Sequence, residues 1–577
     1  MSAMCGIVGY FGNEEASEKI YRGLKRLEYR GYDSAGIATV GNPSIKVEKG
    51  EGTIDEVSNA STDGEIGIGH TRWATHGGVN DRNAHPHLDC DEKIAVVHNG
   101  IINNHEEIKE NLEDHDFRSD TDTEVIPHLI EKKISEGLSF REAVLEAADD
   151  LEGSYATVIV TEEGDMAALK QDSPLAIGLS GEEKFLASDV TPFLEHTSEA
   201  IFLKDGDTVF IDEEIEIFNS GEPVEREVKE IDWDAEQASK EGYDHFMEKE
   251  IMEQPKTVKK ASFQDKTDLE KAVEMMDDAE EIYLTGCGTA SFAASLGAKY
   301  LEEAGYNIRT EQSHELEYSA DQITEEDLVI AVSQSGETAD LLSLLDESQA
   351  PTLAVVNAVG STLARQADHT IYINAGPEIG VASTKAFTGQ VGVLKLLQYA
   401  SEDRVEEGRR KLVETAEAVQ KTVEDNMETL EEISDYFLDK DHAYFIGRDK
   451  GHEMAQESAL KLKELSYIHA EAFPGGEFKH GTLALVEEDT PVIAFLKEEG
   501  YDEIVSNAVE AHSRGADLIG VGNKVLESFE YFIQVPDKGF QEILEVAPFQ
   551  MIAYMTSVKK GKNPDKPRNL AKSVTVK

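Results

Sequence analysis

Short apolar runs separated by polar turns alternate with amphipathic stretches from the start of the chain to about residue 218. Period-two alternation predicts strands, and apolar positions spaced three and four apart predict helices. The predicted strands are residues 5–11, 35–40, 94–98 and 155–160, and the predicted helices are residues 17–29 and 122–136. This pattern predicts a mixed α+β first part. A highly charged stretch at 225–254 follows and is predicted to be a partly helical connector.

The second half of the chain alternates buried strands with helices, which is typical of parallel α/β units. Three strand-like segments also occur twice in the same order. Residues 282–286 resemble 443–447, residues 328–332 resemble 491–495, and residues 352–356 resemble 517–521. The offset of roughly 160 residues is too long for a solenoid repeat and fits two duplicated domains.

The two copies differ after their second repeated strand. The first copy continues as SQSGET (residues 333–338), whereas the second has LKEEG (496–500). Hydroxyl and N–H groups between a strand and a helix start form an anion cradle or a simple helix cap. A second glycine turn, TGCGTAS (285–291), lacks the third glycine of a dinucleotide-binding loop, because Ser291 stands there. The sequence therefore predicts a phosphate cradle in the first copy and no nicotinamide cofactor.

The composition restricts the partners. The chain has 577 residues and a net charge of 54 − 116 = −62, which repels nucleic acid and anionic membranes. No run approaches the roughly 18 apolar residues of a membrane span, and no secretory signal is evident. We expect a cytoplasmic protein whose acidic surface is adapted to a salty cytosol.

The three cysteines form neither a disulfide framework nor a metal-binding pattern, so we predict no metal site. Cys90 and Cys287 are interpreted as ordinary packed thiols. Cys5 differs, because CGIVG (5–9) is followed by HTRWATHG (70–77) and HNGI (98–101). A cysteine that begins a mature chain combines a nucleophilic thiol with an α-amine that titrates at about 7.7–8.0. This chemistry requires removal of Met1–Met4. Translation from Met4 with normal methionine removal is the simplest route, and a processed pro-segment is the alternative.

Eleven motifs, in order, resemble the glutamine:fructose-6-phosphate aminotransferase (isomerising) family along essentially the whole chain. They are CGIVG (5–9), RLEYRGYDSAG (26–36), HTRWATHG (70–77), NAHP (83–86), HNGII (98–102), TDTEV (121–125), SQSGET (333–338), EIGVASTKAFT (378–388), ALKLKELSYIHAE (459–471), KHG (479–481) and RNLAKSVTV (568–576).

The resemblance implies an N-terminal-nucleophile glutaminase domain with an αββα sandwich, followed by two α/β sugar isomerase (SIS) domains with parallel sheets. The implied boundaries are 5–220 for the glutaminase domain, 221–258 for a linker, 259–405 and 406–558 for the SIS domains, and 559–577 for a C-terminal tail. The implied reaction converts D-fructose 6-phosphate and L-glutamine to D-glucosamine 6-phosphate and L-glutamate, without a cofactor.

The resemblance also assigns roles in the glutaminase half. Cys5 is the nucleophile, and the oxyanion hole consists of Asn99 and the backbone N–H of Gly100. A bound glutamine is expected to meet Arg72 through its carboxylate and Asp122 through its ammonium. The remaining glutaminase residues are Thr75 and His76 in the pocket, Arg30 as a support near Cys5, and Trp73 as the gate for ammonia.

In the sugar half, the resemblance assigns Lys572 to a Schiff base with the ketose and Glu464 to proton transfer, with Lys461 beside it. His480 is the ring-opening acid–base group, contributed by the neighbouring subunit of a homodimer. The fructose 6-phosphate site is expected to comprise Thr289, Ser333, Gln334, Ser335, Thr338 and Ser383. Ala290 departs from the family, in which a serine is common at this position.

Two other functions fit parts of these motifs. A related SIS-domain amidotransferase or deglycase would act on another phosphosugar, and an acceptor screen would distinguish it. A non-catalytic sugar-phosphate sensor would need neither Cys5 nor Lys572, and it would release no glutamate from glutamine.

Overall fold

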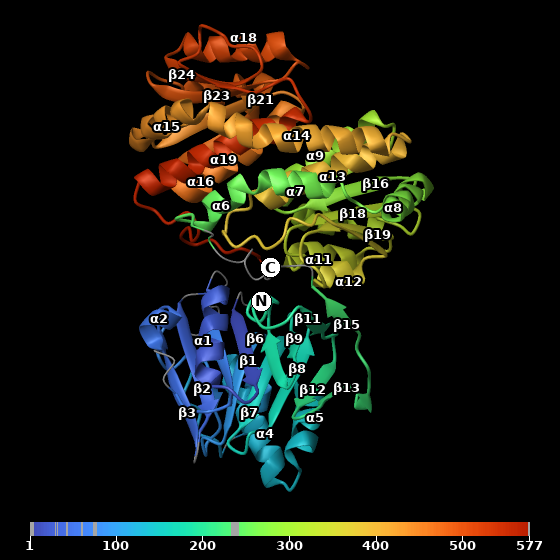
Figure 1. The fold of residues 1–577 in the computed structure, drawn as a ribbon, viewed down its shortest axis with the longest axis vertical. Helices are drawn as coiled ribbons and strands as arrows, with labels where there is room; N and C mark the ends of the chain where they lie inside the picture. Colours follow the sequence, from blue (N-terminus) through green and yellow to red (C-terminus); the bar gives the residue numbers. More distant parts are fainter. Residues whose placement is uncertain are drawn as a thin grey trace. The chain divides into compact units, whose positions relative to one another are not determined.

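The computed structural model describes residues 5–574 except for 29–30, 32, 42–43, 59–61, 73–77, 113, 232–239 and 241. Its contacts divide the chain into two compact units (Figure 1). Residues 1–238 with 573–577 form the first unit, and residues 239–572 form the second.

The first unit is built around two antiparallel sheets. The larger sheet has the order β15-β11-β9-β10-β1-β4-β2-β3, with β1 (Gly6–Phe11), β2 (Ser34–Val40), β3 (Ile45–Glu51), β4 (Ile66–Arg72), β9 (Ala176–Ser180), β10 (Glu183–Ala187), β11 (Glu199–Phe202) and β15 (Val228–Glu230). The smaller sheet has the order β14-β13-β12-β8-β7-β6-β5, with β5 (His87–Leu88), β6 (Ile94–Ile102), β7 (Gly153–Thr161), β8 (Met166–Gln171), β12 (Asp207–Ile211), β13 (Ile215–Asn219) and β14 (Glu222–Pro223). The helices of this unit are α1 (Ala16–Leu27), α2 (Ile54–Val57), α3 (His105–Glu110), the 3₁₀ turn η1 (Asp122–Glu124), α4 (Val125–Ser135) and α5 (Phe140–Asp150).

Alternating side chains hold these layers together, because successive residues of a strand face opposite sides of its sheet. Val8 of β1 packs with Leu24 of α1 on the outer face of the larger sheet. Val97 of β6 lies in the cluster between the two sheets, whereas its neighbour Val96 packs with Ile130 of α4 on the other face. The result is an αββα sandwich, which confirms the predicted fold.

The second unit contains two parallel five-stranded sheets with equivalent strand orders, β17-β16-β18-β19-β20 and β22-β21-β23-β24-β25. Their strands are β16 (Ile282–Gly286), β17 (Ile308–Gln312), β18 (Leu328–Ser333), β19 (Thr352–Val356), β20 (His369–Tyr372), β21 (His442–Gly447), β22 (His469–Pro474), β23 (Thr490–Leu496), β24 (Ala516–Gly522) and β25 (Tyr531–Gln534). The matching order confirms the predicted duplication.

Helices cover both sheets of this unit (Figure 1). They are α6 (Phe246–Met252), α7 (Gln254–Ala261), α8 (Lys266–Asp278), α9 (Thr289–Glu303), α10 (Ser313–Leu316), η3 (Glu317–Gln322), α11 (Ala339–Glu347), α12 (Thr362–Gln366), α13 (Lys385–Ser401), α14 (Val405–Asp425), α15 (Met427–Tyr436), η4 (Phe437–Asp439), α16 (Lys450–Ser466), α17 (Gly475–Phe478), η5 (Thr482–Leu485), α18 (Tyr501–His512) and α19 (Gln541–Lys559).

The structure differs from the sequence-based prediction in two regions. The strands β14 and β15 lie beyond residue 220, where β14 pairs with β13 of the smaller sheet and β15 pairs with β11 of the larger sheet. The helix predicted from residue 122 begins as the 3₁₀ turn η1, and its α-helical part starts at Val125. None of the described helices is both long and apolar enough to cross a membrane.

Candidate functional site

Cys5 lies immediately before β1 and is 2% exposed. The side chain of Asn99, on β6, donates from Nδ2 to the Cys5 carbonyl oxygen at 2.8 Å. The Asn99 Oδ1 atom lies 3.0 Å from His70 Nε2, on β4. The predicted nucleophile and the predicted oxyanion donor therefore lie together, and the histidine fixes which way the amide points.

Gly100 follows Asn99 at a backbone position that excludes a side chain. Its φ is +133°, and a Cβ atom there would lie 1.9 Å from the carbonyl oxygen of Ser154 on the paired strand β7. Glycine is therefore required for β6 to keep its pairing at the point where the backbone N–H is predicted to bind the oxyanion.

The predicted glutamine-binding charges also come together in this unit. Arg72 is 3% exposed at the end of β4, and Asp122 is 5% exposed in η1. Burial lowers the pKa of the Arg72 guanidinium, and the charges of Cys5 and Asp122 oppose this shift. The Asp122 Oδ2 atom accepts a hydrogen bond of 2.8 Å from the N–H of Ile102, which ties the 3₁₀ turn to β6.

Sequence reasoning missed a network of buried histidines behind this site. His85 Nε2 and His98 Nδ1 each lie 2.9 Å from the Thr123 hydroxyl, next to Asp122. Burial lowers the pKa of His98, and it lowers that of His70 to about 3. These rings therefore remain neutral near pH 7 and act as hydrogen-bonding supports. The motifs at 70–77, 83–86 and 98–102 each contain a histidine, and this recurrence could have indicated the histidine network.

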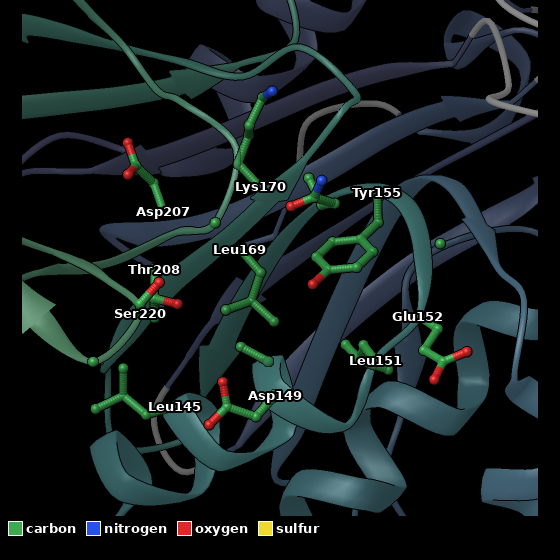
Figure 2. A pocket seen from close by; sticks show the side chains of 15 residues that line it. Leu145, Asp149, Leu151, Glu152, Tyr155, Leu169, Lys170, Asp207, Thr208 and Ser220 are labelled. Carbon is green, nitrogen blue, oxygen red and sulfur yellow. The ribbon is translucent and has the colours of Figure 1, made fainter. Parts of the chain in front are cut away.

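Four predicted glutaminase residues lie outside the described residues, namely Arg30, Trp73, Thr75 and His76. A separate cavity of about 490 Å³ lies on the first unit, lined by residues that include Tyr155, Lys170 and Asp207 (Figure 2). Tyr155 belongs to the cluster between the smaller sheet and its helices. Cys5 and Asn99 are outside the lining of this cavity, so it is not the glutaminase site.

In the second unit, Lys461 joins the two duplicated halves. It is fully buried on α16, and its Nζ donates to the Thr289 hydroxyl at 2.9 Å and to Glu464 Oε2 at 2.7 Å. A second carboxylate, Glu457, lies 3.6 Å from the same ammonium. Burial raises the pKa of Glu457 to about 8, although the Lys461 charge opposes the shift. Sequence reasoning missed Glu457, which stands one helical turn before Lys461 and could have been found from this spacing.

Lys572 is held at a second buried carboxylate. Its side chain is 6% exposed, and its Nζ donates to Glu378 Oε2 at 2.5 Å and to the Gly380 carbonyl oxygen at 2.8 Å. Ser383 also donates to Glu378 Oε2, at 3.0 Å, and Glu378 Oε1 accepts the N–H groups of Thr384 and Ala386 at 2.8 and 2.9 Å. Burial would raise the pKa of Glu378, but the Lys572 charge and these N–H groups hold it below its usual value. Glu378 lies in a recognised motif, yet its contact with Lys572 could not be predicted.

The predicted phosphate cradle connects β18 to α11. The Ser333 hydroxyl accepts the N–H of Gly336 at 2.9 Å, and the Ser335 hydroxyl accepts the N–H of Glu337 at 3.2 Å. Gln334 lies in the same loop, and Thr338 is the residue at the start of α11. Ser383, which is also predicted to lie near the phosphate, donates to Glu378.

His480 is exposed in the segment after α17. Its backbone N–H donates to the Glu477 carbonyl oxygen at 2.8 Å, which closes the turn that follows this short helix. Among the contacts of the described residues, none joins the His480 side chain to Lys572 or Glu464. The role of His480 in a partner's site therefore stays a prediction.

Comparison with known proteins matches both units. Residues 70–195 match a glutamine amidotransferase domain, and residues 275–399 and 436–558 each match a SIS domain. The fold and the two sites thus define a glutamine amidotransferase joined to a pair of SIS domains. The chain is 44% identical to the glutamine–fructose-6-phosphate aminotransferase (isomerizing) of Thermococcus kodakarensis, over 99% of this chain and 100% of that protein. The corresponding protein of Methanothermobacter thermautotrophicus is 43% identical over the same shares.

A solved structure supports the assignment of the second unit. The C-terminal domain of glucosamine-fructose-6-phosphate aminotransferase from Francisella tularensis matches 57% of this chain and 100% of its own, with 32% identity and a TM-score of 0.52. The chain belongs to the glutamine–fructose-6-phosphate aminotransferase (isomerizing) family.

Proposed function

We propose that the chain transfers the amide nitrogen of L-glutamine to D-fructose 6-phosphate and isomerises the product to D-glucosamine 6-phosphate, releasing L-glutamate. The observation that carries the proposal is the burial of Lys572 against Glu378 and the Gly380 carbonyl oxygen. A lysine near the end of a charged tail normally faces solvent. Its fixed position here fits a residue that forms a covalent bond with a sugar carbonyl.

In the glutaminase half, the thiol of Cys5 attacks the glutamine amide carbon, and the α-amine of the same residue takes up and returns the proton. Asn99 Nδ2 and the Gly100 N–H stabilise the oxyanion. Arg72 and Asp122 bind the α-carboxylate and α-ammonium of the substrate. This scheme requires Cys5 to be the first residue of the mature protein, which mass spectrometry of the N-terminal peptide tests.

In the sugar half, the Lys572 amine condenses with the C2 carbonyl of the open-chain ketose and releases water. Because the product carries nitrogen from glutamine at C2, ammonia must then displace the lysine nitrogen from the Schiff base. Glu464 moves a proton from C1 to C2, held in place by Lys461. The cradle of Ser333, Gln334, Ser335 and Thr338 binds the phosphate, with Thr289 and Ser383 nearby.

We further propose a homodimer in which His480 opens the sugar ring in the partner's site. Its exposed position on the surface of the second unit supports this role. Trp73 is proposed to gate the passage of ammonia from the glutaminase site.

Borohydride trapping tests the central step. Fructose 6-phosphate and borohydride are expected to tag the peptide that contains Lys572 in the wild-type protein. Lys572→Arg keeps the positive charge beside Glu378, but a guanidinium cannot deprotonate to attack a carbonyl. This variant is expected to lose synthesis and to retain glutamate release. A tag on another lysine, or synthesis by Lys572→Arg, would overturn the proposal, and an acceptor screen would identify a different phosphosugar substrate.

A further inference from the structure

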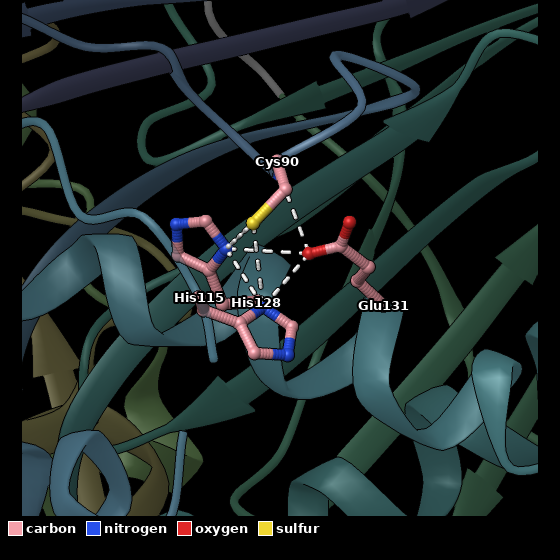
Figure 3. A group of neighbouring side chains, drawn as sticks. All are labelled: Cys90, His115, His128 and Glu131. Carbon is pink, nitrogen blue, oxygen red and sulfur yellow. Dashed lines mark hydrogen bonds and ion pairs between the residues drawn. The ribbon is translucent and has the colours of Figure 1, made fainter. Parts of the chain in front are cut away.

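Four potential metal ligands, none of which is among the proposed glutaminase residues, converge in the first unit (Figure 3). Cys90 lies in the turn between β5 and β6, and His115 lies in the loop after α3. His128 and Glu131 project from one face of α4, three residues apart. Their ligand atoms, one from each residue, all lie within 4.8 Å of one another. The sequence predicted no metal site because these ligands come from separate elements.

The distances between these atoms fit a single tetrahedral ion. Zinc binds sulfur at about 2.3 Å and nitrogen or oxygen at about 2.0–2.2 Å, so tetrahedral ligands are separated by about 3.6 Å for S···N and about 3.3 Å for N···N or N···O. The Cys90 Sγ atom lies 3.6 Å from His115 Nδ1 and 3.5 Å from His128 Nδ1. The two Nδ1 atoms are 3.2 Å apart, and Glu131 Oε2 lies 2.9 and 3.3 Å from them.

The charges of the four groups also fit a divalent cation. A thiolate and a carboxylate contribute two negative charges, and two neutral imidazoles contribute none, so a divalent ion makes the site electrically neutral. This balance matters because His128 is 1% exposed, and the side chains of His115 and Glu131 are 15% and 19% exposed.

A carboxylate lies behind one of the ligands, at an ion-pair distance that is longer than a hydrogen bond. The His128 Nε2 atom, on the far side of the ring, lies 3.8 Å from Glu124 Oε1. Glu124 in turn accepts the N–H groups of Arg118 and Ser119 at 2.8 and 2.6 Å. A carboxylate behind a ligating histidine is the usual outer-shell arrangement of a metal site.

We propose that Cys90, His115, His128 and Glu131 form a four-coordinate structural site for Zn²⁺. A thiolate with two imidazoles favours zinc over Mg²⁺ or Ca²⁺, and four protein ligands leave no open position for catalysis. The site connects the turn before β6 to α4, and η1 with Asp122 lies directly before α4. The bound ion therefore stabilises the segment that carries one of the proposed glutamine-binding residues.

Metal analysis of the full-length protein tests this site. After loading with Zn²⁺ and extensive dialysis, the wild-type protein is expected to retain one zinc ion per chain. Cys90→Ser and His115→Gln are expected to lose it. Cys287→Ser is the matched control, because Cys287 lies in the weaker cluster with His314 and Asp340, whose histidine is exposed. Zinc retained equally by Cys90→Ser and the wild type, or lost from Cys287→Ser alone, would overturn the assignment.

Cobalt gives a second readout that does not depend on the folding of a variant. The zinc-free wild-type protein loaded with Co²⁺ is expected to show the intense d–d bands of a tetrahedral ion and a sulfur-to-cobalt charge-transfer band. Absence of the charge-transfer band from folded protein would refute Cys90 ligation. Zinc removal is expected to lower the melting temperature and glutamate release, while borohydride tagging of Lys572 with fructose 6-phosphate continues. Because metal content is measured directly, failure of this proposal is distinguishable from failure of the proposed function.

Discussion

Replacing Lys461 with methionine tests how the sugar site is assembled. Methionine has a similar length and no charge, so the change removes the ammonium and leaves the packing of α16 largely intact. Lys463→Met is the matched control, because Lys463 is exposed on the same helix two residues further on. A difference between the two variants therefore reports the buried charge.

The contacts of Lys461 set the expected size of the effect. Its hydrogen bonds to Thr289 and Glu464, at 2.9 and 2.7 Å, are charge-assisted, and each contributes about 1.5–3 kcal/mol. Glu457 adds little to the loss, because burial already raises its pKa to about 8 and it is mostly protonated at pH 7. Removing the cation raises that pKa further, so Glu457 stays neutral. Loss of the bond that orients Glu464 is then expected to lower the rate by about 10- to 100-fold.

The assay is formation of glucosamine 6-phosphate from fructose 6-phosphate and glutamine by the full-length protein, with glutamate release measured in parallel. Lys461→Met is expected to form glucosamine 6-phosphate about 10- to 100-fold more slowly and to keep glutamate release, while Lys463→Met keeps both. If Lys461→Met melts like the control and forms glucosamine 6-phosphate at the same rate, the proposed orientation of Glu464 by Lys461 is wrong.

Four other predictions address the remaining features. Asn99→Ala is expected to lower glutamate release by about 10²–10³ without affecting borohydride tagging of Lys572, and an unchanged rate would exclude Asn99 from the oxyanion hole. Because the pKa of His70 is about 3 in the folded protein and about 6.5 when unfolded, its contribution to stability is complete above pH 6.5. As the pH falls below 6.5, that contribution decreases by about 1.4 kcal/mol per pH unit, and melting curves of His70→Gln should show a shallower dependence. Trp73→Ala is expected to release glutamate faster than glucosamine 6-phosphate, whereas equal yields would contradict the gate. Mixing inactive His480→Asn and Lys572→Arg proteins is expected to restore about a quarter of the activity if sites are shared across a dimer, and no recovery would contradict it.

Local patterns predicted the elements of the second unit well. The predicted strands at 282–286 and 352–356 have the same bounds as β16 and β19, because fully buried parallel strands are continuous apolar runs between turns. The strand β15 was missed, since its three residues are all exposed and polar neighbours surround them. Its pairing with β11 is a tertiary contact that local alternation does not encode.

The site residues show the same difference between what local sequence patterns predict and what depends on tertiary contacts. The motifs predict roles for Cys5, Asn99 and Lys572, but they do not predict the groups that contact these residues. Glu378 contacts Lys572 across 194 positions of the chain, and the ring of His70 faces Asn99 from another strand. Such contacts depend on the folded arrangement, so a sequence indicates the reacting residue more readily than its support.

The duplicated halves of the second unit have diverged into complementary parts. At the position of the phosphate cradle in the first copy, the second copy has Lys497, whose Nζ lies 3.2 Å from Glu542 and 3.5 Å from Glu545 of α19. These carboxylates stand beside Lys497 as a bound phosphate would. Their negative charge therefore opposes the binding of a phosphate in the second copy. The second copy instead contributes α16, whose Lys461 reaches Thr289 at the start of α9 in the first copy. We therefore expect one sugar site per chain, with the proposed phosphate cradle from one copy and the proposed proton-transfer helix from the other.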